Sequence, residues 1–292
     1  FSAMSKTSAA PARSHPAYRM GALEWTMLVA LAAMWGASFF FNKVALRELP
    51  PFTLVWVRAV LGALLLAALV RMSGGSLAQP RSVWRSFVVI GVLNNLLPFS
   101  LISYGQTQIA SGLASILNAT TPLFTVVVAH FVTRDERMTL PKLAGVLFGM
   151  AGVAVMIGID ALRGVGLNVL AQFAILGAAL SYACTSLYGR RLRDVPAMVA
   201  AAGPIICAAV LMAPVALVVD HPWELPMPGA ATWGAMIGLA ALCTALSYFL
   251  YFRILAAAGA TNLMLVTFLI PVSALLLGVS FLDETIEPRQ FA

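Results

Sequence analysis

Long uninterrupted runs of apolar residues follow one another along nearly the whole chain, with short polar connectors between them. Each run is about 20 residues long, the length that an α-helix needs to cross the hydrocarbon core of a bilayer. The runs are continuous and do not alternate, which excludes the strands of a membrane β-barrel. The pattern predicts an all-α integral membrane protein with spanning helices at residues 24–42, 52–70, 83–104, 109–131, 141–159, 169–189, 196–219, 230–252 and 260–282.

The composition argues against a soluble enzyme. Of the 292 residues, 61% are hydrophobic and 10% are charged, whereas soluble domains have about 45–50% apolar and about 25% charged residues. The net charge is +7, but the basic residues are scattered over the connectors, so no nucleic-acid partner is expected. Cys184, Cys207 and Cys243 stand inside apolar runs without ligand spacing, so we interpret them as small buried hydrophobic residues and expect neither a metal nor a cofactor.

The basic residues predict how the chain is oriented. Lysines and arginines near helix ends are retained on the cytoplasmic side of a membrane. If the N-terminus is cytoplasmic, only Lys43, Arg47, Arg163 and Arg289 of the 18 basic residues fall outside, and Arg58 lies within a helix. Residues 1–23, rich in Ser, Ala and Pro, are therefore expected to form a disordered cytoplasmic tail.

The two halves of the chain repeat each other. The shared features are a Leu-Arg-acid-aliphatic-Pro segment, a tyrosine, a proline and an acidic pair, in the same order and at nearly constant spacing. They are Leu46–Pro50 and Leu192–Pro196, Tyr104 and Tyr251, Pro122 and Pro271, and Asp135-Glu136 and Asp283-Glu284. The sequence thus predicts two repeats, residues 24–160 and 168–292.

The repeat also predicts the number and sense of the helices. The first repeat continues past its acidic pair into a fifth apolar span, whereas the second ends at Ala292. We therefore expect that a tenth helix is missing from the end of the second repeat. Five helices per repeat would insert the second half upside down, which gives the inverted repeats found in many transporters.

These features resemble the drug/metabolite transporter superfamily in its EamA-type, ten-helix branch. The resemblance covers about residues 24–292 and rests on Trp35-Gly36-Ala37-Ser38, on Pro50-Pro51 followed by Arg58, and on the twin proline and acid segments. Within that branch the chain is similar to the YddG-type amino-acid exporters, and the resemblance implies export by alternating access. The second half departs from the first in having Pro204 where the repeat would place a second arginine.

Arg58 is the leading candidate for a substrate contact. It lies about six residues into a predicted span, and a charge at that depth is costly unless it faces protein, a watery cavity or an anion. One interpretation is that it attracts a carboxylate into a central cavity. The other is that it extends to the interface or bonds to neighbouring carbonyl groups.

Other polar and aromatic residues within the spans could line the same cavity. Ser, Thr and Asn can equally bond to helix backbones, and aromatic rings can serve helix packing. The full set predicted to bind substrate is Trp35, Ser38, Asn42, Trp56, Arg58, Asn94, Asn95, Tyr104, Asn118, Ser181, Tyr182, Tyr248 and Tyr251. Pro122 and Pro271 occupy corresponding places in two spans and are predicted to act as gates, because paired helix interruptions mark transporter sites.

The sequence therefore predicts a secondary transporter of the bacterial inner membrane. It would export small metabolites, amino acids including aromatic ones above all, and would work as a monomer in the lipid bilayer. Exporters of other metabolites or drugs, nucleotide-sugar or sugar-phosphate carriers, and non-transport membrane subunits remain alternatives. Catalytic motifs such as GxSxG and HExxH are missing, so no enzyme activity and no catalytic residue are expected.

Overall fold

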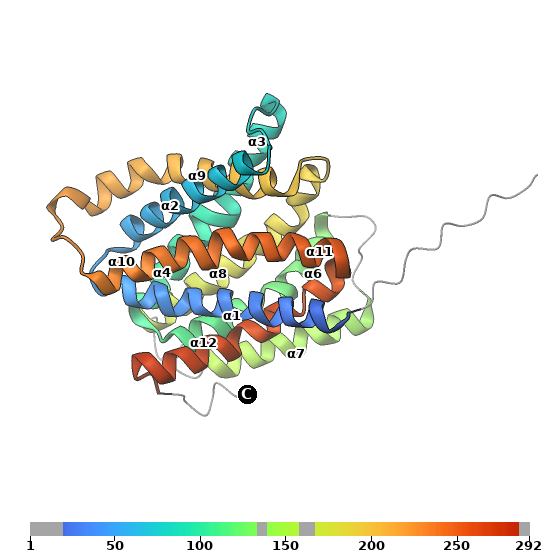
Figure 1. The fold of residues 1–292 in the computed structure, drawn as a ribbon. Coiled ribbons are helices and arrows are strands. Elements are labelled where there is room, and N and C mark those ends of the chain that lie inside the picture. Colours follow the sequence, from blue (N-terminus) through green and yellow to red (C-terminus); the bar gives the residue numbers. More distant parts are fainter. Residues whose placement is uncertain (1–19, 133–138, 158–166, 286–292) are drawn as a thin grey trace, which may run out of the picture.

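The computed structural model describes residues 20–132, 139–157 and 167–285, and all regular structure in these segments is helical (Figure 1). Three sequence-based expectations lie wholly or partly outside the described residues. They concern the N-terminal tail, the acidic pair Asp135-Glu136 and the residues after 285.

The first half contains five helical spans, two of them built from more than one segment. Its elements are α1 (Ala22–Ala45), α2 (Pro51–Met72), α3 (Arg81–Ile90), the π-helical turn η1 (Gly91–Leu96), α4 (Leu97–Gln108), α5 (Ser111–Asn118), α6 (Thr121–Val132) and α7 (Leu140–Ile157). Segments α3, η1 and α4 form one span, and α5 and α6 form another.

The second half repeats this order over the described residues. Its elements are α8 (Leu167–Tyr188), the 3₁₀ turn η3 (Gly189–Leu192), α9 (Ala197–Asp220), the short turn η4 (Pro222–Glu224), α10 (Ala230–Ala240), the π-helical turn η5 (Ala241–Leu246), α11 (Ser247–Leu263) and α12 (Val266–Leu282). The nine helical stretches of the described chain coincide with the predicted spans, and seven of them are long and apolar enough by themselves to cross a membrane. The all-α membrane fold is confirmed.

Two spans contain or adjoin a break in the helix. The fourth span, predicted as residues 109–131, is interrupted at Ala119–Thr120, where α5 ends and α6 begins. The ninth span, predicted to begin at residue 260, is separated from the eighth by a break in α11 at Gly259, whose φ of 78° lies in the left-handed region. Glycine adopts this conformation without a steric penalty, so the chain can turn there.

The two halves are related by an inverted repeat. Helix α1 and its counterpart α8 run in opposite directions through the bundle (Figure 1). Helices α2 and α9 pack against each other, α4 packs on α8 as α10 and α11 pack on α1, and α6 packs on α8 as α12 packs on α1. Each half also carries a π-helical turn in the middle of its third span. The shared packing shows that the sequence repeat is a structural repeat.

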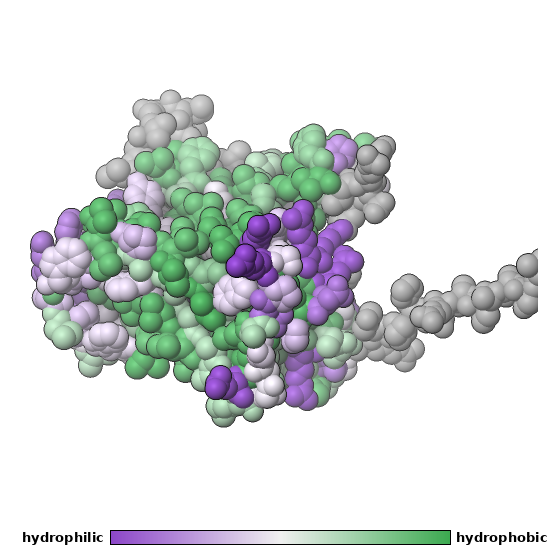
Figure 2. All heavy atoms as spheres, turned by 90° about the horizontal axis from the view of Figure 1, so that it is seen from above, coloured by the Kyte–Doolittle hydropathy of each residue, from purple (hydrophilic) through white to green (hydrophobic). Residues whose placement is uncertain are grey.

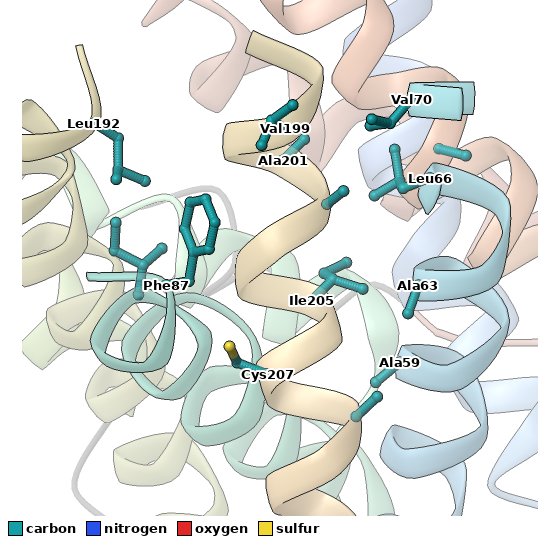
Figure 3. Close-up of a cluster of buried hydrophobic side chains, with 14 residues drawn as sticks. Ala59, Ala63, Leu66, Val70, Phe87, Leu192, Val199, Ala201, Ile205 and Cys207 are labelled. Carbon is teal, nitrogen blue, oxygen red and sulfur yellow. The ribbon is translucent and has the colours of Figure 1, made fainter. Parts of the chain in front are cut away.

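Small side chains hold α2 and α9 together. Ala59, Ala63, Leu66 and Val70 recur at helical spacing on α2, and all are buried. They belong to one hydrophobic cluster with α9 residues such as Ile205 (Figure 3). Because alanine side chains let helix backbones approach closely, van der Waals packing stabilises this pair even where lipid removes the hydrophobic driving force.

A second close approach explains part of the Trp35–Ser38 motif. A Cβ atom on Gly36 would lie 1.8 Å from the Ser273 hydroxyl oxygen and 2.8 Å from the Ile270 carbonyl oxygen. Only a residue without a side chain fits this α1–α12 contact. Ser273 Oγ donates a hydrogen bond to the carbonyl of Ala32, 3.0 Å away, which adds a polar contact to the same interface.

The surface of the bundle is apolar around its sides. Large hydrophobic side chains such as Leu64, Phe148, Val210 and Phe281 are between 60% and 80% exposed. Figure 2 shows hydrophobic residues over most of this face, with the hydrophilic ones in a group from the middle of the view to its right side and a paler group at the left margin. A soluble protein does not expose apolar surface of this extent, and lipid chains are the environment that it fits.

Carboxylates cap helix N-termini at one end of the bundle, which we call the capped end. Glu48 accepts a hydrogen bond from the Gly229 N–H at the start of α10 (2.8 Å), and Asp220 accepts one from the Thr53 N–H in α2 (2.6 Å). Glu284 accepts bonds from the N–H groups of Ser111 and Gly112 at the start of α5, at 2.8 and 3.3 Å. Each contact joins the two halves, and each places a negative charge at the positive end of a helix dipole.

Candidate functional site

A cavity of about 800 Å³ lies between the two halves of the bundle. Side chains of α1, α2, the third and fourth spans, α8, α9, α11 and α12 line it. The lining includes Arg193 and Ala197, which are exposed residues just before and at the start of α9. It includes none of the capping carboxylates. The cavity therefore opens at the end opposite the capped end, and we call this the open end.

Arg58 projects from α2 into the cavity as a buried cation. Its side chain is 9% exposed, and its guanidinium carbon lies 3.8 Å from the centre of the Phe99 ring. Its Nε is buried without a hydrogen-bond acceptor among the described residues. None of the described lining residues is an aspartate or a glutamate. The ring contact offsets part of the desolvation of the guanidinium, but the lining residues in the described segments give it no anion.

Neutral polar groups surround the guanidinium. The phenols of Tyr182 and Tyr248 and the thiol of Cys243 are close enough to affect it electrostatically. Asn94 Nδ2 donates a hydrogen bond to the Tyr248 hydroxyl oxygen at 3.0 Å, which fixes that phenol across the boundary between the halves. These groups orient dipoles around Arg58 but supply no negative charge.

Aromatic rings form one wall of the cavity. Trp35 and Tyr251 lie 5.9 Å apart between ring centroids, and Tyr251 meets Phe252 edge to face at 5.2 Å. Phe252 stacks in turn with Tyr248 at 6.4 Å. All four line the cavity. Rings at these separations pack stably against one another, and their remaining faces suit a flat apolar group.

Asn42 lines the cavity, but its side-chain amide is hydrogen-bonded to other residues of the protein. Its Nδ2 donates to Gln106 Oε1 at 2.9 Å, and its Oδ1 accepts a bond from the Ser103 hydroxyl at 3.1 Å. Gln106 Nε2 donates in turn to the Phe39 carbonyl at 2.9 Å. Because this network is buried and satisfied on every atom of Asn42, its role is to tie α1 to α4.

The two π-helical turns are the features that the sequence reasoning missed. A π turn breaks the regular ladder of backbone bonds and leaves a carbonyl oxygen to be satisfied from elsewhere. In the first half the Ser181 hydroxyl donates to the Leu93 carbonyl at 2.7 Å. In the second half the Thr244 hydroxyl donates to the Leu239 carbonyl at 2.9 Å. A hydroxyl residue that lies on another helix, or five positions after the carbonyl that it satisfies, forms no local sequence pattern that would predict a π turn.

The cavity gathers most of the residues that the sequence singled out. Those that line it are Trp35, Ser38, Asn42, Arg58, Asn94, Asn118, Tyr182, Tyr248, Tyr251 and Pro122. The others lie outside the lining. They are Trp56, Asn95, Tyr104, Ser181 and Pro271. Residues of the two groups are interspersed along the chain, and both groups contain polar and aromatic residues. The type of residue therefore does not show which ones line the cavity.

The excluded residues have other surroundings. Trp56 packs with the cluster formed by α2, α9 and α10, and Ser181 serves the Leu93 carbonyl. Asn95 is 1% exposed and has neither amide atom bonded among the described residues. Pro271 stands inside the uninterrupted helix α12, whereas Pro122 follows the break between α5 and α6. The two prolines are therefore not equivalent in the structure, and a gating role remains a prediction for both.

Several lining residues were not among the sequence candidates. Phe99, Cys243, Thr244 and Phe252 all contact the cavity. Phe99 lies in the apolar stretch after Asn94, where no polarity sets it apart. Only its position under the Arg58 guanidinium gives it a role.

Comparisons with known proteins agree with this architecture. The sequence pattern of the EamA-like transporter family matches residues 23–158 and again residues 169–292. The chain is 26% identical over 262 residues to the uncharacterized inner membrane transporter YedA of Escherichia coli, covering 89% of this chain and 83% of that protein. It is 27% identical over 177 residues to a probable amino-acid metabolite efflux pump of the same species, covering 59% and 55% of the two chains. A crystal structure with 20% sequence identity superposes with a TM-score of 0.66 and covers 92% of both chains, which shows the same fold.

Proposed function

The chain belongs to the EamA-like transporter family, and is therefore a multi-pass membrane transporter; from this premise we propose that it carries small metabolites with a carboxylate group, amino acids including aromatic ones among them, through the central cavity. We further propose that it is a secondary transporter of a bacterial inner membrane that exports these substrates and works as a monomer. Its N-terminus is then cytoplasmic, and the open end of the cavity faces the cytoplasm.

A single observation carries the substrate assignment. Arg58 is a buried cation in the cavity, and no described lining residue supplies an anion for it. Burying an unpaired charge costs several kcal/mol in a protein interior, so the site is incomplete until an anionic group enters. A carboxylate matches the guanidinium in size and in its two acceptor oxygens, and the aromatic wall accommodates a flat apolar side chain.

The capped end supports alternating access as the mechanism. The cavity reaches the open end, while three carboxylate caps close the opposite end. Substrate enters from the open end and binds next to Arg58. Release on the other side requires the two halves to separate at the capped end, so the caps must break during each cycle.

A carrier of sugar phosphates or nucleotide sugars fits the site less well. Phosphate recognition uses several cations or a dense set of N–H donors. Arg58 is the only basic residue among the described lining residues that is buried, since Arg193 is exposed at the mouth. The probable efflux pump among the relatives favours amino-acid metabolites in name, and that supports the same choice.

Counterflow in proteoliposomes tests this function. Vesicles are loaded with unlabelled phenylalanine and exposed to labelled amino acids, with and without a pH gradient. Saturable exchange is expected from the wild-type chain, at least tenfold less from Arg58→Met, and unchanged exchange from Arg71→Gln, which removes an exposed cation at the end of the same helix. The absence of exchange with every amino acid, from protein that remains monodisperse, would contradict the proposal.

A further inference from the structure

The charges around the cavity distinguish the two ends of an amino acid. For the carboxylate of an amino acid, Arg58 supplies a guanidinium whose Nε has no hydrogen-bond acceptor among the described residues. An α-ammonium group would need a carboxylate or a set of strong acceptors in the same space. None of the described lining residues is acidic.

The acidic residues of the described chain are committed elsewhere or lie at helix ends. Glu48, Asp220 and Glu284 each cap a helix N-terminus at the capped end. These three carboxylates therefore belong to the end wall that the cavity does not reach. A bound ammonium would have only neutral oxygens to contact, such as Asn118 Oδ1 and the phenols.

Two effects oppose an ammonium in this cavity. An ammonium group loses its hydration when it enters a low-dielectric site, and neutral acceptors replace only part of that hydration. Arg58 also repels it, because like charges in one buried site disfavour each other. The aromatic wall offers a cation–π contact as partial compensation. A carboxylate attached to the same body also loses hydration, but the Arg58 guanidinium attracts it and compensates that loss with charge-assisted hydrogen bonds.

We propose that the cavity is a monocarboxylate site, which recognises one carboxylate through Arg58 and a flat apolar body through the wall formed by Trp35, Tyr248, Tyr251 and Phe252. An α-ammonium group on the ligand then weakens binding. The inference rests on the proposed function and narrows its substrate class. Aromatic carboxylic acids without an amino group are then better ligands than the corresponding amino acids.

Four ligands with one phenylalkyl body test it. They are 3-phenylpropionate, L-phenylalanine, 2-phenylethylamine and 3-phenylpropanol, and they differ in which charged groups they carry. Binding to the full chain in nanodiscs is measured by titration calorimetry. The expected order is phenylpropionate first, with phenylalanine at least tenfold weaker and the amine weaker than the uncharged alcohol.

Variants of Arg58 test whether this residue determines the order of ligand affinities. In Arg58→Met the advantage of phenylpropionate over phenylpropanol should fall at least tenfold, and the amine should no longer bind more weakly than the alcohol. Arg58→Lys keeps the charge and should retain the preference for the carboxylate if Arg58→Met proves unstable. Arg71→Gln serves as the matched control and should bind all four ligands as the wild type does.

The outcomes separate the two proposals. Phenylalanine binding more tightly than phenylpropionate would overturn the monocarboxylate site, while amino-acid transport would stand. Amine binding equal to that of the carboxylate would also overturn it, since the aromatic wall would then be the recognising element. If no ligand binds and no amino acid exchanges in counterflow, both the inference and the proposed function fail.

Discussion

Glu48, in the connector after α1, accepts a hydrogen bond from the backbone N–H of Gly229, 181 residues later, at 2.8 Å. Asp220 and Glu284 make the corresponding contacts with Thr53 and with Ser111 and Gly112. All of these contacts cross between the halves, and all lie at the capped end. The cavity reaches only the other end, so the contacts hold closed the side that the cavity does not reach.

The Glu48 contact gives the first prediction, a pH dependence of stability. The pKa of Glu48 is lowered because the Thr232 side chain and the Gly229 N–H donate hydrogen bonds to its carboxylate. A carboxylate whose pKa is lowered by folding stabilises the folded state fully above the pKa of the unfolded chain, about 4.3, and this contribution is lost as the pH falls through the folded value. Glu48→Gln should therefore lower the melting temperature at pH 7, by an amount that shrinks below about pH 4.

The measurement is thermal unfolding in detergent from pH 7 to pH 3.5. Glu224→Gln is the matched control, because Glu224 is an exposed acid of the same end and makes none of the capping bonds. If Glu48→Gln lowered the melting temperature by the same amount at every pH measured, the charge of Glu48 would not contribute to the cap.

Ser181 gives a prediction about stability that excludes a binding role. Its hydroxyl satisfies the Leu93 carbonyl in the π-helical turn η1, and an unsatisfied buried polar group costs about 1–3 kcal/mol. Ser181→Ala should destabilise the protein by about this amount and leave substrate affinity unchanged. Thr107→Val removes a hydroxyl that bonds within the last turn of α4 and should have little effect. If Ser181→Ala instead lost substrate affinity without losing stability, Ser181 would be a substrate-binding residue.

Gly36 gives a prediction about helix packing. The added Cβ in Gly36→Ala would clash with the Ser273 hydroxyl and the Ile270 carbonyl, and overpacking of this kind costs about 1–3 kcal/mol. Gly234→Ala is the control, since a Cβ there meets nothing within 4 Å and alanine favours a helix over glycine by about 0.5–1 kcal/mol. Unfolding in a denaturing detergent should rank the variants Gly234→Ala, wild type and Gly36→Ala from most to least stable. Equal stability of the two variants would show that α1 and α12 can move apart at no cost.

Arg58 gives a prediction in which stability and function change in opposite directions. A cation kept for substrate rather than for the fold costs stability when the cavity is empty. Arg58→Met should therefore melt at the same temperature as the wild type or higher, with a gain of about 1 kcal/mol, while transport is lost. Added substrate should raise the melting temperature of the wild type and not of the variant. Severe destabilisation of Arg58→Met would instead make Arg58 a structural residue.

Much of the fold follows from the order of residues alone. The apolar runs are longer than any soluble helix requires, so the bilayer is the only environment that fits them, and the described helices coincide with them. The matched Leu-Arg-acid-aliphatic-Pro segments predicted the repeat, because two copies of one packing unit need the same turns. The π-helical turns were not predicted, since the hydroxyls that satisfy their carbonyls come from Ser181 on another helix and from Thr244, five residues after the Leu239 carbonyl.

The sequence by itself determined that the chain crosses a membrane, that its halves repeat, and that Arg58 stands within a span without a symmetric counterpart. The tertiary structure alone decided which polar residues face the cavity, for example Asn94 and not the adjacent Asn95. In a membrane bundle both the lipid-facing and the core-facing sides of a helix are apolar, so periodicity does not reveal the inner face. A π turn also shifts the face of the following helix by about 100°, the angle per residue. The packing of the helices, and not the order of their residues, therefore decides which side chains line the cavity.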